Sequence, residues 1–202
     1  MEKKLPIYEL VLGDNGEWDG VYANSIVTEP AIKRAGVYMS AAKSKPVIMA
    51  TEDGERSMFY GPVMIPDLMI YRKDDKRGEY YVTYTENTVR KCMMEYLKKG
   101  LQSQTTIEHM FPVRGVTMVE CWAVENPELD KSVALGFDPF PKGTWMAGYH
   151  IEDASTRDMI KNGTLTGFSI EAWFDHVLVQ MNEDLSIESF MRELDEIMKS
   201  EK

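Results

Sequence analysis

The sequence lacks the short motifs that would assign a function directly. Its 202 residues contain no phosphate-binding loop of the form Gly-x-x-x-x-Gly-Lys-Ser/Thr and no dinucleotide fingerprint Gly-x-Gly-x-x-Gly. A His-Glu-x-x-His zinc helix and a Gly-x-Ser-x-Gly nucleophile elbow are also missing. These absences argue against P-loop nucleotide hydrolases, dinucleotide-dependent enzymes, zinc peptidases of that class and α/β-hydrolases.

Cysteine and long apolar runs are equally scarce. The two cysteines, Cys92 and Cys121, form no Cys-x-x-Cys pair and are too few for a tetrahedral thiolate site. No stretch of 18 apolar residues occurs, so we expect no membrane span. The first residues, 1–6, lack the apolar stretch of a signal peptide, and we expect the chain to act in the cytoplasm of the cell that makes it.

Basic residues are outnumbered by acidic ones. The chain has 23 Lys and Arg against 33 Asp and Glu, which gives a formal net charge of -10. Binding to nucleic acid requires clustered positive charge, so neither DNA or RNA nor an anionic membrane is expected as a partner. We also expect no metal and no cofactor, since no ligand spacing for either is recognisable.

The patterns that are present indicate an α+β fold with many short strands. Thr85 can cap a helix over 86–99, whose apolar residues recur at helical spacing, and Gly100 ends it. We expect a core domain over 1–180 and a C-terminal amphipathic helix in 181–202, which either packs on the core or contacts a partner such as another protomer. The expected strands are 7–12, pieces of 57–71, 80–84, 104–111, 116–124, 144–151 and 164–179. Further helices are expected over 153–161 and 185–199. A long loop is expected over 125–143.

Ser169 is a candidate nucleophile because of its place in the strand 164–179. Apolar residues occupy the even positions from Phe168 to Phe174, while the odd positions are mostly polar. Side chains alternate between the two faces of a strand, so Ser169 faces away from the core. Gly167 would let a substrate backbone approach closely. The same pattern also fits an ordinary polar residue on a solvated face.

His109 is the candidate base among three histidines. A hairpin with its turn at 113–114 would place His109 opposite Met118 and would bring Glu120 within reach of the imidazole. Glu120 could then hold one tautomer of the ring, as the third member of a triad does. A register slip of one residue would move Glu120 to the other face. Glu171 and His176 are alternatives for this role. A lone histidine in a strand is more often structural than catalytic, so the structural interpretation of His109 also stays open.

Other readings of the reactive residues are weaker. Cys121 lies in an apolar strand without an adjacent base, whereas a reactive thiolate needs an electropositive neighbourhood. His150 stands at the end of a predicted strand and is read as structural.

Several segments, taken in order, resemble one protein family. They are residues 28–31 (Thr-Glu-Pro-Ala), 59–66 (Phe-Tyr-Gly-Pro-Val-Met-Ile-Pro), 106–109 (Thr-Ile-Glu-His), 119–122 (Val-Glu-Cys-Trp), 143–146 (Gly-Thr-Trp-Met) and 167–171 (Gly-Phe-Ser-Ile-Glu). Over about residues 7–175 the sequence resembles the XkdF-like serine proteases of tailed phages, which are similar to prohead proteases and, more distantly, to herpesvirus assemblins.

The resemblance implies a mostly antiparallel β-barrel with flanking helices. It also implies a serine endopeptidase in which Ser169 is the nucleophile and His109 the base. Such an enzyme would process capsid and scaffold proteins, and itself, inside the assembling prohead in the host cytoplasm, and it could form a homo-oligomer. The alternative is a catalytically inactive capsid-assembly or scaffold component with the same fold.

Overall fold

The computed structural model describes residues 5–13, 19–34, 48–49 and 57–180. The helix expected over 185–199, and with it the segment 181–202, lies outside these described residues.

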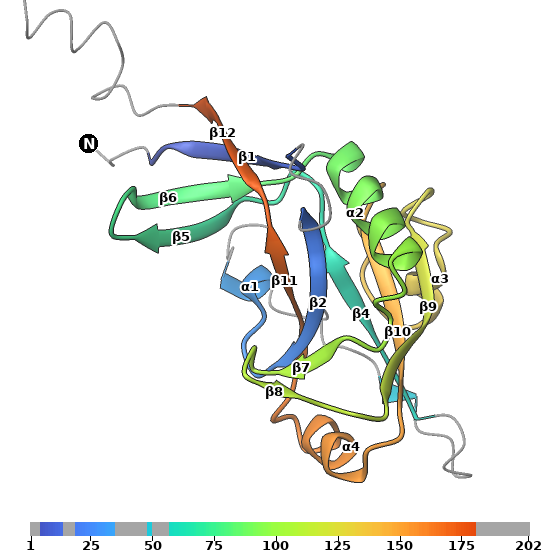
Figure 1. Cartoon of the computed structure of the whole chain (residues 1–202). Helices are drawn as coiled ribbons and strands as arrows, with labels where there is room; N and C mark the ends of the chain where they lie inside the picture. The colour runs from blue at the N-terminus through green and yellow to red at the C-terminus, as the bar shows by residue number, and fades with distance from the viewer. Residues whose placement is uncertain (1–4, 14–18, 35–47, 50–56, 181–202) are drawn as a thin grey trace, which may run out of the picture.

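The described strands form three sheets of four strands each. The first has the order β12-β1-β6-β5, the second β11-β2-β7-β8 and the third β3-β4-β10-β9 (Figure 1). Their bounds are β1 Ile7–Val11, β2 Gly20–Val27, β3 Ile48–Met49, β4 Met58–Met64, β5 Ile70–Asp74, β6 Gly78–Thr83, β7 Thr105–Ile107, β8 Phe111–Pro112, β9 Val116–Ala123, β10 Trp145–Ile151, β11 Gly167–Trp173 and β12 Asp175–Gln180. Four helices accompany them in the described part of the chain: α1 Ala31–Arg34, α2 Glu86–Lys98, α3 Lys131–Ala134 and α4 Ala154–Lys161.

The mixed, mostly β composition agrees with the predicted class, but the predicted barrel is wrong. Each sheet ends in an edge strand among the described residues, so no ring of hydrogen-bonded strands closes. Two pairings, β1 with β6 and β2 with β7, are parallel. Parallel neighbours need a crossover rather than a tight turn, so these two pairings join strands that are distant in the sequence.

The helix α2 forms as local signals predict. The Thr85 hydroxyl accepts a hydrogen bond from the Thr88 N–H, and Gly100 follows with a φ of 70°. The buried residues of α2 include Val89, Cys92 and Tyr96, and the helix packs against β2 and β10 (Figure 1). The cap at Asp153, which accepts from the Thr156 N–H at the start of α4, is likewise as predicted.

The main core fixes which face of β11 is buried. Phe168 is 2% exposed and its ring lies 4.9 Å from that of Phe59 in β4. At Gly61, also in β4, a Cβ atom would stand only 3.1 Å from the Phe168 ring, so the two strands pack closely there. A second cluster, which includes Tyr60, Phe137, Phe140 and Met146, anchors the 125–143 segment to β4 and β10. No helix within the described ranges is long and apolar enough to span a bilayer.

Candidate active site

Strand β11 presents Ser169 on its non-core face, as the alternation predicts. Phe168 is in the core, and Ile170 and Ala172 pack against it, whereas Ser169 is partly exposed. In the antiparallel pairing with β2, Ser169 lies opposite Ser25 and Glu171 lies opposite Ala23. The Ser169 hydroxyl makes no hydrogen bond to any described residue, so a substrate could engage it.

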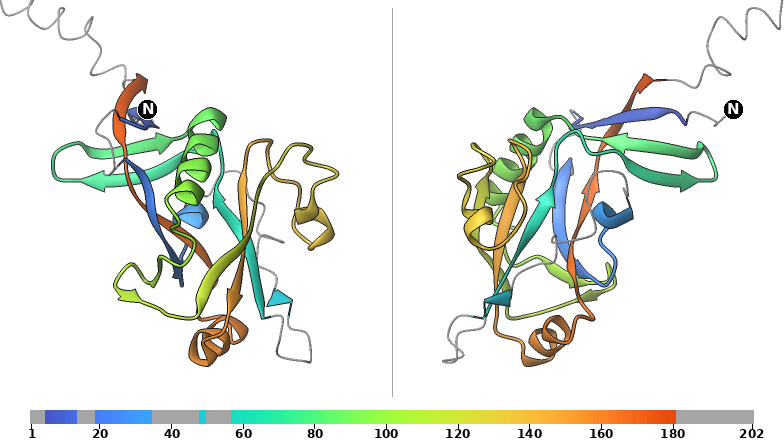
Figure 2. Two further views of the ribbon diagram at one scale, coloured as in Figure 1. Left: turned by 45° about the vertical axis from the view of Figure 1, so that its right-hand side comes forward. Right: turned by 180° about the vertical axis from the view of Figure 1, so that it is seen from behind.

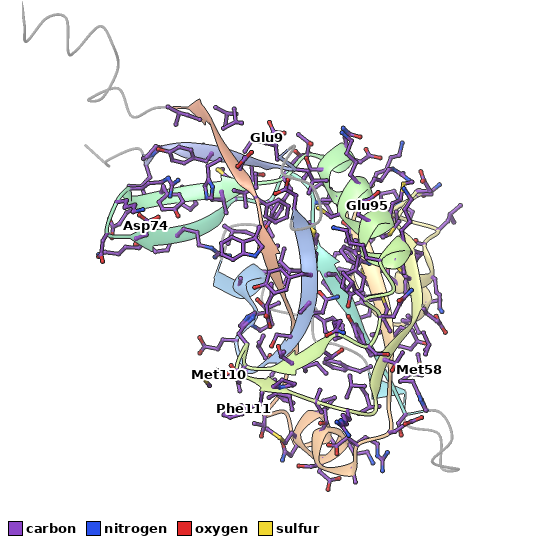
Figure 3. All side chains as sticks on the ribbon, in the orientation of Figure 1. Glu9, Met58, Asp74, Glu95, Met110 and Phe111 are labelled. Atoms are coloured by element: carbon purple, nitrogen blue, oxygen red, sulfur yellow. The ribbon has the colours of Figure 1, made fainter. Side chains whose placement is uncertain are left out.

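His109 is carried by a tight turn between β7 and β8. The Met110 N–H donates to the Ile107 carbonyl at 3.1 Å, which closes a turn with Glu108 and His109 at its centre. Their φ angles are 52° and 59°, in the left-handed region that non-glycine residues seldom adopt. The His109 side chain is 41% exposed, and Met110 lies at the exposed end of the turn (Figure 3).

Three contacts with the segment 25–28 hold this strained turn. The Ser25 hydroxyl, which belongs to a fully buried residue, accepts a hydrogen bond from the His109 N–H at 2.9 Å. The Glu108 N–H donates to the Ile26 carbonyl at 3.2 Å, and the Glu108 carboxylate accepts from the Thr28 N–H at 2.5 Å. A strained backbone conformation persists only where the surrounding structure holds it in place. These three hydrogen bonds hold the turn in its left-handed conformation.

Glu171 lies beside the His109 ring. Its Oε1 atom is 3.4 Å from His109 Nδ1 and accepts a hydrogen bond from the Thr106 hydroxyl at 2.5 Å. Glu171 comes from β11 and Thr106 from β7, on either side of the central strand β2. The residue of β2 opposite Glu171 is Ala23, whose small side chain lets the two flanking side chains meet across the strand.

Ser169 and His109 therefore converge on one residue. Ser169 is the direct neighbour of Ser25 across the sheet, and Ser25 binds the His109 backbone. No hydrogen bond between the Ser169 hydroxyl and His109 occurs among the described contacts. Resting active sites often have looser geometry than their substrate complexes, so this separation is compatible with a catalytic pair.

Glu120 is not near His109, and the hairpin that was expected to join them is wrong. After His109 the chain pairs β8 with β7 and then turns again, so β9 pairs with β10 and Glu120 faces Gly148. The β7–β8 turn and α3 lie on opposite sides of the molecule (Figure 2).

The Glu120 carboxylate is instead bound by Lys131 of α3 and accepts from the Tyr60 hydroxyl at 3.0 Å. Burial alone would raise the pKa of Glu120, but the bonds from Lys131 and Tyr60 outweigh it and lower the pKa. Glu120 is thus held by Lys131 and Tyr60 in a different sheet from Ser169.

The remaining candidates lie apart from Ser169. His176 in β12 packs edge-on against the rings of both Tyr8 and Tyr80, at 6.1 and 6.3 Å, and burial, followed by the charge of Arg77, lowers its pKa. His150 in β10 faces Glu152, with 3.8 Å between Nδ1 and the carboxylate.

Cys121 has none of the features of a reactive cysteine. Its sulfur accepts from the Trp145 indole N–H at 3.1 Å, and burial raises the pKa of its thiol to about 11. At neutral pH it is a thiol rather than the nucleophilic thiolate. In the described ranges, no three histidine, cysteine or acidic side chains gather as a metal site would require.

Comparison with known proteins identifies the class of protein to which the chain belongs. Residues 45–177 match a family of phage serine proteases, and this range includes His109, Ser169 and Glu171. The chain belongs to that family, which is described as "Putative phage serine protease XkdF". This confirms the resemblance seen in the sequence. A search of curated proteins and a search of solved structures each returned no match.

Proposed function

We propose that the chain is a serine endopeptidase that processes the capsid and scaffold proteins of a tailed phage, and itself, inside the assembling prohead in the host cytoplasm. Membership of the phage serine protease family supports the reaction class. The observation that carries the assignment of residues is the convergence of Ser169, His109 and Glu171 on one face of the β11-β2-β7 sheet.

In this proposal His109 is the general base. The contact between Glu171 and Nδ1 would keep the proton on that nitrogen and leave Nε2 to take the hydroxyl proton of Ser169. The Ser169 oxygen then attacks the peptide carbonyl, and His109 returns the proton to the leaving amine. Water hydrolyses the resulting ester by the same route, with His109 taking a proton from the water and returning it to Ser169.

The local strain around His109 also supports this reading. Only three described residues other than glycine have positive φ angles, and two of them are Glu108 and His109. Strained backbone of this kind clusters at functional sites, where it fixes a side chain in a position that ordinary turns do not provide. Here it turns the imidazole back over the sheet toward Glu171.

The experiment compares Ser169→Ala with Ser103→Ala, a change at an exposed serine outside the site. Each variant is co-expressed with the phage capsid and scaffold proteins, and cleavage products are followed by mass spectrometry. In parallel, the purified proteins are treated with a fluorophosphonate probe. We expect wild type and Ser103→Ala to cleave and to be labelled at residue 169, and Ser169→Ala to do neither.

Normal processing by Ser169→Ala would overturn the assignment. If wild type and Ser169→Ala both leave the capsid and scaffold proteins intact while shells still require the chain, the protein is instead an inactive assembly component. Loss of labelling in Ser103→Ala alone would also exclude Ser169 as the nucleophile.

A further inference from the structure

Two exposed aromatic side chains stack beside the candidate active site. Tyr22 of β2 and Trp173 of β11 have ring centroids 6.5 Å apart and an interplanar angle of 26°. Tyr22 is 40% exposed and Trp173 is 62% exposed. Large aromatic rings are usually buried, and a stacked pair left open to solvent presents a flat apolar surface for a ligand.

The alternation of β11 places this pair on the side of the sheet that carries the nucleophile. Trp173 follows Ser169 by four positions and Glu171 by two, so the three side chains share one face. At about 3.3 Å per residue, the Trp173 position lies roughly 13 Å along the strand from Ser169. That separation equals about four residues of an extended peptide.

A β-bulge accounts for the position of Tyr22. Glu171 pairs with Ala23 and Ala172 pairs with Val21, so Tyr22 is an extra residue without a partner in β11. With regular pairing, Tyr22 would face Ala172, which packs on the core. The bulge instead turns the Tyr22 ring outward onto Trp173, and bulges often redirect a side chain next to an active site.

The surroundings of Tyr22 connect the pair to the catalytic face. Burial and then the nearby Glu171 carboxylate raise the pKa of the Tyr22 phenol. Tyr22 therefore lies close enough to Glu171, the side chain that contacts His109, for the two to interact electrostatically.

We propose that Tyr22 and Trp173 form a substrate subsite that binds a large apolar side chain about four residues from the bond cleaved at Ser169. The inference rests on the proposed protease function. A substrate strand lying along β11 would place its reacting carbonyl at Ser169 and one apolar side chain on the Tyr22–Trp173 surface. The occupant is thus an apolar residue of the substrate protein, read at a fixed distance from the cleaved bond.

The test determines cleavage sites in a peptide library made from a digested bacterial proteome. Mass spectrometry compares the wild-type full chain with Trp173→Ala, Trp173→Phe, Ser169→Ala and the control Leu129→Ala. Leu129 serves as the control because it is 83% exposed and far from β11 in sequence. We expect wild type and the control to enrich Phe, Trp, Tyr, Leu and Met about four positions from the cleaved bond. Trp173→Ala should lower that enrichment about tenfold, as expected for one lost apolar contact, while Trp173→Phe keeps most of it.

The outcomes separate the two proposals. If wild type cleaves and Ser169→Ala does not, but Trp173→Ala cleaves with an unchanged sequence profile, the subsite is wrong and the protease stands. If wild type cleaves nothing beyond what Ser169→Ala cleaves, the protease function fails and the subsite with it. Should Trp173→Ala prove unfolded by circular dichroism, Tyr22→Ala provides the same comparison from the other ring.

Discussion

At the scale of single residues, two glutamates distinguish the structure from the simplest reading of the sequence. Glu171 contacts the His109 ring, whereas Glu120 binds Lys131 and Tyr60 in another sheet. Both carboxylates are partly buried, so burial alone does not identify the one proposed to take part in catalysis. The groups that each carboxylate contacts make that distinction.

Glu171→Gln is therefore expected to lower kcat for peptide cleavage by about a hundredfold or more, since an amide beside Nδ1 neither fixes the required tautomer nor stabilises the imidazolium. KM should change little, because Glu171 contacts His109 rather than substrate. The measurement is steady-state cleavage of a peptide identified from the processed capsid protein.

Glu120→Gln is the matched control for that experiment. Lys131 would lose its charged partner in a half-exposed pair, so we expect only a small loss of stability and no change in kcat. A larger loss of kcat in Glu120→Gln than in Glu171→Gln would contradict the role given to Glu171.

At the scale of elements, the β7–β8 turn is the part most directly tied to the proposed function. Glu108→Gly and Glu108→Ala both remove the carboxylate that accepts from the Thr28 N–H. They differ in backbone preference, because only glycine adopts a φ of 52° without strain. We expect Glu108→Gly to be more stable than Glu108→Ala by about 1 kcal/mol in urea unfolding. Equal stability, or a more stable alanine variant, would contradict a left-handed conformation at this position.

The elements that the sequence predicts correctly depend on local signals. The cap at Thr85 and the apolar spacing of α2 need no information from elsewhere in the chain, and neither does the alternation that turns Ser169 away from Phe168. The same parity places Glu171 beside Ser169, and this local signal could have identified it.

The pairing of strands that are distant in the sequence could not be predicted from such local signals. The single hairpin expected between His109 and Glu120 is replaced by two turns, the second containing Gly115 with a φ of 70°. The parallel pairing of β2 with β7, which brings Ser25 to His109, joins residues about eighty positions apart in the sequence. Register across such distances depends on the packing of the whole sheet rather than on local pattern.

The β5–β6 hairpin gives a prediction for acid stability. Asp74 accepts hydrogen bonds from the Tyr80 hydroxyl and from the Arg77 and Lys76 N–H groups, and these lower its pKa from 3.8 to about 2. Because the folded pKa is lowered, the stabilisation is present above about pH 4 and is lost as the pH falls toward 2.

Asp74→Asn should accordingly be less stable than wild type at neutral pH, and the difference should shrink between pH 4 and pH 2. Thermal unfolding followed by circular dichroism across that range measures it. Asp75→Asn, at an exposed neighbour with no hydrogen bond to a described residue, should follow the wild-type curve. A constant difference between Asp74→Asn and wild type at all pH values would show that Asp74 is not the titrating group.

At the scale of the whole molecule, the site and the second core cluster belong to different sheets. Phe168 ties β11 to β4 through Phe59 on one face, while Tyr60, the next residue of β4, faces the second cluster. The Glu120–Lys131 pair lies on that second side. The arrangement separates the residues that support the fold there from those proposed to carry out catalysis.

Gly148→Ala tests that separation. A Cβ atom at Gly148 would collide with the Tyr60 ring and would stand 3.2 Å from the Glu120 Cβ, so the ring would have to move within a packed cluster. Overpacking of this kind destabilises by about 1–3 kcal/mol, which urea unfolding would detect. Val119→Ala, at a 55% exposed position of the neighbouring strand, should change stability far less.

Below its unfolding transition, Gly148→Ala should cleave peptide at the wild-type kcat, because the disturbance falls on the face of β4 away from β11. A loss of kcat in the folded variant would instead mean that the second cluster and the Ser169 face are coupled, and that the loop over 125–143 takes part in organising the site.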